Sequence, residues 1–332
     1  MTVVSEPIAV HFETRNQGYS MKALSPELVE AALAPYPGLI ERIRPSYNAD
    51  PARTDEFLHA AEVVMFSGRM PLAGLAERAP RLKWVQLTSA GADQALKHLP
   101  KGVLLTNARG VHVTRTREIA TMALLMMNNH MPAFQSAQLR REWAPHSADP
   151  IAGKTVVVLG MGALGGAVAE AAQGLGLRVI GLSRSGRPHD SVDEAWTMEH
   201  LQACFKRADF VVVTLPLTET TRGCVDAAAL DALPAHAQIL NIGRSPVMDY
   251  GHLAQKLEAG ELAGAMLDVF DEEPLPAESP LWSVKNLIVT PHSWLDYPSG
   301  YARLAMEAFA EDLDNYVNGR PMRRRVDPAL GY

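Results

Sequence analysis

The sequence predicts an α/β protein with two Rossmann-like domains, each built on a doubly wound parallel sheet. Two observations predict this class. Short apolar, β-branched runs alternate with helix-like stretches along the chain, without internal repeats or low-complexity tracts. The alternation falls into two blocks, and a length of 332 residues suits about two domains.

The first block covers about residues 5–112. We expect strands at Ile8–Phe12, Glu62–Phe66, Trp84–Leu87 and Val103–Thr106, and helices around Pro26–Ala34 and Leu72–Arg78. This block has no glycine-rich phosphate loop. A long helix rich in Ala, Leu and Met is expected from about Arg115 to Met131. A helix this apolar is either buried in the fold or packed on a partner subunit.

The second block is more regular. Thr155–Leu159 is nearly all apolar, as expected for a strand covered on both faces. Further strands are expected at Arg178–Leu182, Phe210–Thr214, Gln238–Ile242, Ala265–Val269 and Leu287–Thr290, which makes six in a doubly wound sheet. A final helix from about Ser299 to Asn318 is expected to fold back onto the first block. We therefore expect a discontinuous, smaller substrate domain of residues 1–112 plus 297–332, and a dinucleotide-binding domain of residues 113–296.

Charge and composition exclude several classes of function. The formal net charge is −6 and the pI about 6.0, which argues against a nucleic-acid partner. The short basic run Arg323–Arg325 is interpreted as a solvated tail. No apolar run approaches the roughly 18 residues that a membrane span needs, so we expect no membrane partner.

The cysteines and the first residues favour a cytoplasmic protein. Cys204 and Cys224 are too few for a disulfide framework and lack metal-type spacing, so we expect reduced thiols and no metal site. The segment Met1–Pro7 has no basic region followed by an apolar stretch, and it does not resemble a signal peptide.

The strongest single motif is Gly160-Met161-Gly162-Ala163-Leu164-Gly165, which fits G-x-G-x-x-G between a predicted strand and a predicted helix. Gly160 permits the tight turn, Gly162 lets the backbone approach a pyrophosphate, and Gly165 lets the helix pack on the strand. The helix N-terminus then directs its free N–H groups at the anion. The motif predicts a dinucleotide site.

The end of the second strand of this block predicts which dinucleotide is bound. An NAD site usually has Asp or Glu there to bind the ribose 2′-hydroxyl. This chain has Ser183-Arg184-Ser185 instead. An arginine can pair with a 2′-phosphate, so we predict NADP(H) in preference to NAD(H). The alternative is a surface arginine with loose cofactor preference, in which case NAD(H) also serves.

Three titratable residues follow predicted strands of the second block, where ligands of open α/β sheets bind. Arg244 can hold a carboxylate bidentately and polarise a carbonyl, but it cannot act as an acid. Histidine ordinarily titrates near neutrality, so His292 can donate a proton to a ketone oxygen as hydride reaches the carbon. A carboxylate beside it, Glu273 or Glu272, would orient the ring and stabilise its cation. Asp249 is expected to cap the next helix.

Together, seven segments in order resemble the D-isomer-specific 2-hydroxyacid dehydrogenase family over about residues 85–320. They are Leu87–Asp93, Thr106–Gly110, Gly160–Gly165, Leu215–Thr218, Asn241–Asp249, Asp268–Pro276 and Thr290–His292. The resemblance implies two α/β domains with a cleft between them, and a homodimer with the helix near Arg115–Met131 at its interface.

The resemblance also implies roles for individual residues. Arg244, Glu273 and His292 match the family's catalytic set, and Glu273 is favoured over Glu272 because it directly precedes the proline. The substrate carboxylate is expected on the amides of Ser89, Ala90, Gly91 and Ala92, beside Arg244. Leu215, Pro216, Ile242 and Asp268 join the cofactor site by the same resemblance. Hinges are expected near residues 110–115 and 293–299.

The Ser183–Ser185 segment resembles NADPH-dependent glyoxylate and hydroxypyruvate reductases. The predicted function is hydride transfer between NADP(H) and a small 2-keto or 2-hydroxy acid, with glyoxylate- or hydroxypyruvate-like acids as substrates. Two alternatives remain: formate or phosphite oxidation on the same scaffold, and a non-enzymatic dinucleotide-sensing protein like the family's corepressor branch. Trp294 replaces a smaller residue of the family, and Arg109 is interpreted as structural.

Overall fold

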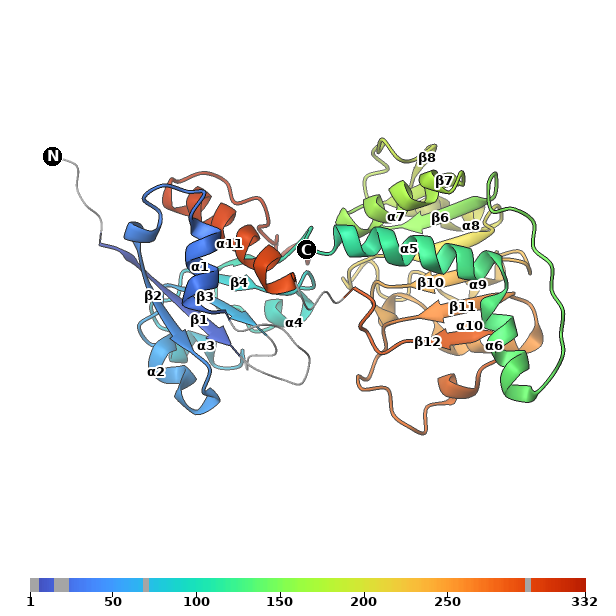
Figure 1. Cartoon of the computed structure of the whole chain (residues 1–332), viewed down its shortest axis with the longest axis horizontal. Coiled ribbons are helices and arrows are strands. Elements are labelled where there is room, and N and C mark those ends of the chain that lie inside the picture. The colour runs from blue at the N-terminus through green and yellow to red at the C-terminus, as the bar shows by residue number, and fades with distance from the viewer. Residues whose placement is uncertain (1–5, 15–23, 68–71, 296–299) are drawn as a thin grey trace. The chain divides into compact units, whose positions relative to one another are not determined.

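The computed structural model describes residues 6–14, 24–67, 72–295 and 300–332. The chain divides into two compact units: unit 1, Met1–Val111 with Tyr297–Tyr332, and unit 2, His112–Asp296. In Figure 1, unit 1 contains the blue and red ends of the chain, and unit 2 contains the green to orange middle. Among the described residues, no helix is both long and apolar enough to cross a membrane.

Unit 1 is a parallel sheet covered by helices on both faces. Its strands are β1 (Ile8–Thr14), β2 (Ile43–Asn48), β3 (Val63–Ser67), β4 (Trp84–Leu87) and β5 (Leu104–Thr106), in the order β2-β1-β3-β4-β5. One face packs on α1 (Pro26–Leu33) and α11 (Tyr301–Val317), and the other on α2 (Thr54–Leu58), α3 (Leu75–Arg78) and α4 (Asp93–Leu96). Val63 and Met65 lie on the first face and Val64 and Phe66 on the second, as in any strand buried on both sides.

Unit 2 is a larger parallel sheet of the same kind. Its strands are β6 (Thr155–Leu159), β7 (Arg178–Ser183), β8 (Glu194–Thr197), β9 (Phe210–Val213), β10 (Gln238–Asn241), β11 (Gly264–Leu267) and β12 (Leu287–Val289). The order β12-β11-β10-β9-β6-β7-β8 reverses direction between β6 and β9. The helices are α5 (Val113–Asn128), α6 (Met131–Arg140), α7 (Ala163–Gly174), α8 (Leu201–Phe205), α9 (Ala227–Asp231) and α10 (Tyr250–Ala259).

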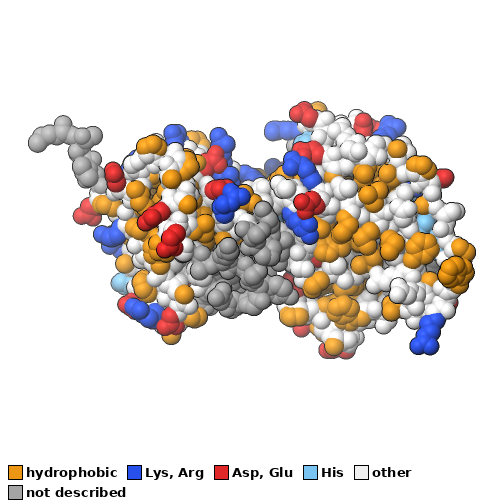
Figure 2. All heavy atoms as spheres, viewed as in Figure 1, with side chains coloured by type: hydrophobic (Ala, Val, Ile, Leu, Met, Phe, Trp, Pro, Cys, Tyr) orange, Lys and Arg blue, Asp and Glu red, His pale blue; other side chains and the backbone are white. Residues whose placement is uncertain are grey.

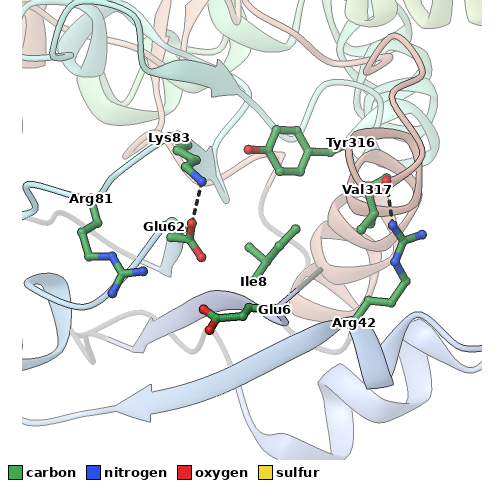
Figure 3. Close-up of a pocket in the computed structure, with 8 residues that line it drawn as sticks. All are labelled: Glu6, Ile8, Arg42, Glu62, Arg81, Lys83, Tyr316 and Val317. Carbon is green, nitrogen blue, oxygen red and sulfur yellow. Dashed lines mark hydrogen bonds and ion pairs between the residues drawn. The ribbon is translucent and has the colours of Figure 1, made fainter. Parts of the chain in front are cut away.

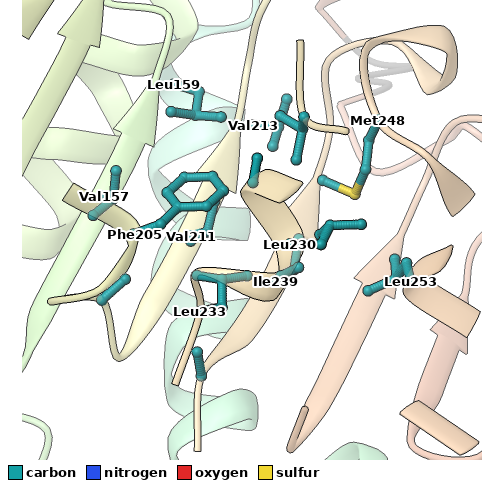
Figure 4. Packing of buried hydrophobic residues seen from close by; sticks show 14 of the residues in the cluster. Val157, Leu159, Phe205, Val211, Val213, Leu230, Leu233, Ile239, Met248 and Leu253 are labelled. Carbon is teal, nitrogen blue, oxygen red and sulfur yellow. The ribbon is translucent and has the colours of Figure 1, made fainter. Parts of the chain in front are cut away.

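The unit 2 core has two layers because each strand directs alternate side chains to opposite faces. Val157 and Leu159 of β6 pack toward α8, α9 and α10, where Phe205 fills the layer shown in Figure 4. Val156 and Val158 pack toward α5 and α7 on the other face. The predicted class, α/β with two doubly wound parallel sheets, is confirmed.

The strand count was predicted one too low in each block. Within the described residues, the two sheets have five and seven strands, because β2 and β8 escaped prediction. Both are edge strands, and edge strands need no continuous apolar run. Pro45 lies within β2, and an edge strand tolerates a proline because one side of its backbone is unpaired. The long helix predicted to Met131 also ends earlier, since His130 adopts a left-handed φ of 56° between α5 and α6.

The prediction of a solvated tail at Arg323–Arg325 is wrong. The Arg324 guanidinium donates to the carboxylate of Glu311 at 2.8 Å and to the carbonyl of Ala308 at 3.2 Å. Arg109 donates to the carbonyl of Arg323 at 2.6 Å. The amide of Val326 then donates to the carbonyl of Leu105 at 2.8 Å, beside β5. The segment is part of unit 1, and Arg109 contributes to holding it there.

Candidate active site

The carboxyl ends of the unit 2 strands bring the predicted cofactor and catalytic residues to one edge of the sheet. The strand order reverses between β6 and β9, and ligands of open α/β sheets bind at such a switch point. The Thr214 hydroxyl, just after β9, lies 3.0 Å from the carbonyl of Leu159 and 2.8 Å from that of Gly160. The loops after β6 and β9 are therefore held against each other.

The Gly160–Gly165 loop has the shape that pyrophosphate binding requires. Gly160 has a φ of +94°, a conformation that L side chains rarely adopt. A Cβ on Gly165 would lie 1.7 Å from the carbonyl oxygen of Gly160, so only glycine permits this packing of α7. A Cβ on Gly162 would meet nothing within 4 Å, and no side chain caps the first turn of α7. The open space and the uncapped amides fit a pyrophosphate.

The other predicted cofactor residues surround this loop at the same sheet edge. Met161, Ala163 and Leu164 belong to the loop and the first turn of α7, Leu215 and Pro216 follow β9, Ile242 follows β10, and Asp268 follows β11. Leu215 and Ile242 are buried. The structure thus gathers all of these residues on one edge of one unit.

Ser183 is the last residue of β7, and neither it nor the two residues that follow carry a carboxylate. Arg184 and Ser185 are exposed, and the Ser183 hydroxyl accepts a hydrogen bond from the amide of Gly186 at 3.1 Å. A second exposed arginine, Arg187, stands in the same turn, and sequence reasoning missed it. Its spacing of three residues from Arg184 was the available signal. The turn presents guanidinium and hydroxyl groups, which suit a 2′-phosphate.

His292, just past β12, and Glu273, in the loop after β11, form a hydrogen-bonded pair. Nδ1 of His292 lies 2.9 Å from Oε1 and 2.8 Å from Oε2 of Glu273. Oε1 also accepts a hydrogen bond from the amide of Phe270 at 3.0 Å. Glu272, the other candidate partner, is exposed. The carboxylate holds Nδ1 and leaves Nε2 as the ring nitrogen that can exchange a proton with a ligand.

Arg244 follows β10 and is half-buried. Its Nη1 donates to the carbonyl of Gly243 at 2.9 Å. Asn241, the last residue of β10, accepts a hydrogen bond from the Gly243 amide at 2.9 Å and lies 3.0 Å from the Tyr250 hydroxyl, which donates to Val269. Burial raises the pKa of that hydroxyl, so it stays a donor at neutral pH. Sequence reasoning missed these supporting residues because an Asn at the end of a strand and a Tyr at the start of a helix are unremarkable in a sequence.

Asp268 supports the segment that carries His292. It is 2% exposed, and its Oδ1 accepts hydrogen bonds from the Thr290 hydroxyl at 2.6 Å and from the Ser293 amide at 3.3 Å. Burial raises the pKa of Asp268. From the resemblance we predicted that Asp268 contacts the cofactor. The hydrogen bonds show a structural role, because they hold the segment on both sides of His292. Asp249 caps α10 as predicted, accepting from the His252 amide at 2.9 Å.

The Ser89–Ala92 loop follows β4 at the carboxyl edge of the unit 1 sheet. Within the described part of the chain, the backbone amides of Ser89, Ala90, Gly91 and Ala92 have no hydrogen-bond acceptor. Four consecutive amides in this condition can hold an anion such as a carboxylate.

The segment after β12 is fixed to the start of α5. Nδ1 of His112 donates to the carbonyl of Leu295 at 3.0 Å, and Nε of Arg115 donates to the carbonyl of Trp294 at 3.1 Å. The Trp294 side chain is partly buried against the core layer beneath α5. Residues 296–299, the rest of the second predicted hinge, lie outside the described residues.

A hollow of about 450 Å³ opens in unit 1 near the amino ends of its strands (Figure 3). It is lined by Glu6, Ile8, Arg42, Glu62, Arg81, Lys83, Tyr316 and Val317. Lys83 donates to Glu62 at 2.6 Å, and Arg42 donates to the carbonyl of Val317 at 2.9 Å. Most of its charge is satisfied within the protein, and it lies at the wrong end of the sheet for a switch-point ligand. No group of His, Cys, Asp and Glu in the described residues could hold a metal ion.

Comparison with known proteins gives consistent matches. The family model "D-isomer specific 2-hydroxyacid dehydrogenase, NAD binding domain" matches residues 121–293. A glyoxylate reductase from Aeropyrum pernix is 32% identical over 258 residues, which cover 74% of this chain and 76% of that protein.

Two solved structures extend the likeness to almost the whole chain. An NADPH-dependent glyoxylate/hydroxypyruvate reductase from Sinorhizobium meliloti, in complex with NADP and sulfate, is 31% identical with a TM-score of 0.80, covering 98% of this chain and 100% of that one. A D-isomer specific 2-hydroxyacid dehydrogenase from Xanthobacter autotrophicus, in complex with NADPH and MES, is 29% identical with a TM-score of 0.80, covering 99% and 100%.

Proposed function

This chain belongs to the D-isomer-specific 2-hydroxyacid dehydrogenase family, and we propose that it is an NADP(H)-dependent reductase of small 2-keto acids such as glyoxylate and hydroxypyruvate. The observation that carries this proposal is the His292–Glu273 pair, with both oxygens of Glu273 within 2.9 Å of Nδ1. The pair stands at the same sheet edge as the Gly160–Gly165 loop, within unit 2. A proton donor and a dinucleotide loop on one edge suit the reduction of a carbonyl.

The proposed chemistry assigns each residue one task. When bound, the nicotinamide supplies the hydride to the carbonyl carbon. Nε2 of protonated His292 gives its proton to the carbonyl oxygen, so the product is a 2-hydroxy acid and the ring is left neutral. The carboxylate of Glu273 orients the ring through Nδ1 and stabilises its cation. The guanidinium of Arg244 stabilises the negative charge that develops on the oxygen.

The substrate carboxylate needs N–H donors, and we assign two groups of the chain to it. In unit 1, we assign this task to the amides of Ser89, Ala90, Gly91 and Ala92, which have no acceptor among the described residues. In unit 2, we assign Arg244 to substrate binding, since a guanidinium binds carboxylates bidentately.

The reaction is tested by following the absorbance of the reduced nicotinamide. The purified chain would be mixed with NADPH or NADH and with glyoxylate, hydroxypyruvate, pyruvate or phenylpyruvate in turn. We expect fast loss of signal with NADPH and at least one of the first two acids. If the absorbance falls with no combination of cofactor and acid although NADPH binding is measurable, the proposal is contradicted and a dinucleotide-sensing protein is favoured.

Substitution of the catalytic residues tests the mechanism separately. Removing a positioned general acid costs on the order of 10²–10⁴-fold in rate. We therefore expect His292→Ala and Arg244→Ala each to lower turnover by at least a hundredfold, with an unchanged circular dichroism spectrum. Near-normal turnover in both variants would show that other residues perform the reaction.

The cofactor preference is proposed to depend on Arg184. Its side chain is exposed in a turn without a carboxylate. We expect Arg184→Ala to raise KM for NADPH at least tenfold and to leave KM for NADH within about twofold, since NADH has no 2′-phosphate. Lys206→Ala, another exposed cation of unit 2, serves as the control. An equal effect on both cofactors would show that Arg184 does not bind the 2′-phosphate.

We propose a homodimer formed through the α5 and α6 face. Large apolar side chains are exposed there, and Figure 2 shows hydrophobic side chains gathered over this region of unit 2. They are Met122, Leu125, Met131, Leu139 and, just beyond α6, Trp143, which is 97% exposed. A soluble monomer rarely exposes such a set, whereas a second copy would cover it. In sedimentation experiments, we expect the wild type to be a dimer and the Leu139→Asp variant to be a monomer.

We also propose that the protein works in the cytoplasm. Cys204 is buried and Cys224 is half-buried, and both are free thiols. Free thiols are usual in a reducing compartment. Fractionation of cells that express the tagged chain would check this location.

A further inference from the structure

Among the described residues, the hydrogen bonds to the backbone of the loop that we assign to the substrate carboxylate all go to its carbonyl oxygens. The Ser89 carbonyl accepts from the Ala108 amide at 2.9 Å, and the Gly91 carbonyl accepts from the Ser89 hydroxyl at 2.9 Å. The Ala90 carbonyl accepts from Nδ2 of Asn107 at 2.7 Å. The Thr88 carbonyl accepts from the Tyr301 hydroxyl. Four consecutive carbonyl oxygens are thus engaged, while the four amides that follow them have no acceptor in the part of the chain that the structure describes.

Fixing a carbonyl also fixes the next amide. A trans peptide unit is planar, and its N–H points opposite to its C=O. Within the described residues, the one cis peptide lies elsewhere, at Glu273–Pro274. Holding the carbonyls of Thr88 and Ala90 therefore fixes the directions of the Ser89 and Gly91 N–H groups. Two of the four anchors come from side chains outside the loop, and those two can be removed by substitution.

Asn107 is a rigid anchor. It follows β5 and is 6% exposed. Its side-chain Oδ1 accepts a hydrogen bond from the backbone amide of Arg109 at 3.2 Å, and its backbone amide donates to the carbonyl of Arg324 at 3.3 Å. With both ends of the side-chain amide engaged, the group has one orientation, in which Nδ2 faces the Ala90 carbonyl.

Tyr301 anchors the loop from a different element. It is the first residue of α11 and is 9% exposed, so its ring is fixed by packing and its hydroxyl reaches the Thr88 carbonyl. The end of β5 and the start of α11 therefore converge on one loop although they are almost two hundred residues apart in sequence.

We propose that Asn107 and Tyr301 are positioning residues for the substrate: they orient the amides of the Ser89–Ala92 loop toward the carboxylate of a 2-keto acid without touching it. This inference rests on the proposed function and deepens it. Preorganised donors lose little entropy on binding, so loosening the loop should weaken carboxylate binding and leave hydride and proton transfer intact.

The test uses substitutions that remove a donor and keep the shape. For Asn107→Asp and Tyr301→Phe in the full-length chain, KM for the 2-keto acid and the inhibition constant of oxalate would be measured, together with kcat and Kd for NADPH. We expect both substrate-side constants to rise about tenfold, as loss of one hydrogen bond of about 1.4 kcal/mol would give. We expect kcat to change less than about threefold and Kd for NADPH to stay constant. If Asn107→Asp does not fold, Asn107→Ala takes its place.

Matched controls come from the same unit. Asn318 also donates its side-chain amide to a backbone carbonyl, that of Asp314 at 2.8 Å, and Tyr316 is a second tyrosine of α11. Asn318→Ala and Tyr316→Phe should leave KM and the oxalate constant unchanged. A merely structural role for Asn107 and Tyr301 would lower thermal stability without moving these constants, and this result would overturn the inference. A wild-type chain that reduces no 2-keto acid would instead overturn the proposed function itself.

Discussion

Replacing Glu273 by glutamine isolates the charge of the carboxylate beside His292. The change keeps the shape of the side chain and removes its negative charge. In the structure, Oε1 and Oε2 of Glu273 lie 2.9 and 2.8 Å from Nδ1 of His292, and Oε1 also accepts from Phe270. A glutamine oxygen can still accept a hydrogen bond from either donor. The main loss is the electrostatic stabilisation of the histidine cation.

The size of the effect follows from the geometry and exposure of the pair. A hydrogen bond to a charged group contributes about 1.5–3 kcal/mol. The side chains of His292 and Glu273 are 45% and 25% exposed, so solvent screening favours the lower end of that range. About 1.5 kcal/mol in the transition state corresponds to a loss of roughly tenfold in kcat/KM.

The assay compares Glu273→Gln with Glu272→Gln under steady-state turnover of NADPH and glyoxylate. Glu272 is the neighbouring carboxylate, is exposed, and has no hydrogen bond or ion pair among the described residues. We expect the tenfold loss only in Glu273→Gln, with Kd for NADPH unchanged in both variants. A Glu273→Gln variant within twofold of wild type, or an equal loss in Glu272→Gln, would refute the reasoning.

Three further predictions test the cofactor loop, the thiols and a buried pair. Gly162→Ala should leave the melting temperature unchanged, because the added Cβ meets nothing within 4 Å. The same change should raise Kd for NADPH at least tenfold, because the methyl group fills the space assigned to the pyrophosphate. An unchanged Kd would show that the pyrophosphate binds elsewhere. Burial raises the pKa of Cys224 to about 11, so at pH 8 only about one thiol in a thousand is ionised, and iodoacetamide should neither label it nor inactivate the folded enzyme. Burial lowers the pKa of His11, which lies 2.9 Å from Glu13, so its contribution to stability is complete above pH 6.5 and declines below it. The melting temperature of His11→Gln should therefore depend less steeply on pH between 6.5 and 5 than that of the wild type, and an equal slope would contradict this.

The positions of the main site residues were predictable because strand ends are visible in the sequence. Continuous apolar runs mark buried parallel strands, and the residue after each run lies at the carboxyl edge of the sheet. That rule alone is enough to bring the Gly160 loop, Arg244 and His292 to one edge. It failed for β2 and β8, since an edge strand has one neighbour and needs no continuous apolar run.

The sequence pattern could not decide between neighbouring residues of the same type. Glu272 and Glu273 have the same chemistry, and which of them faces His292 depends on the backbone path of the loop after β11. Periodicity cannot supply that path. Resemblance favoured Glu273, and the structure places that carboxylate against the ring. The difference between the two glutamates is one of direction, and direction is set by contacts such as the one from the Phe270 amide.

Buried polar support was hidden for a different reason. Asp268 accepts hydrogen bonds from two groups more than twenty residues later in the chain, Thr290 and Ser293. The role of Asn107 depends on its hydrogen bond to the carbonyl of Ala90, seventeen residues earlier in the chain. Such partners meet only after the sheet has formed, so no local spacing encodes them. A single sequence shows which residues have the chemistry for a site but not which residues hold them.

The backbone at His292 shows why that support matters. His292 has a φ of +49°, a left-handed conformation that costs roughly 1–2 kcal/mol for a residue with a Cβ. Its amide donates to the Thr290 carbonyl at 3.0 Å, and Asp268 holds Thr290 and Ser293 on either side of it. The buried carboxylate thus keeps a short, strained turn closed, and the turn directs the imidazole toward Glu273. A relaxed turn would leave the same residues in the sequence without the 2.8 Å contact on which the proposed proton transfer depends.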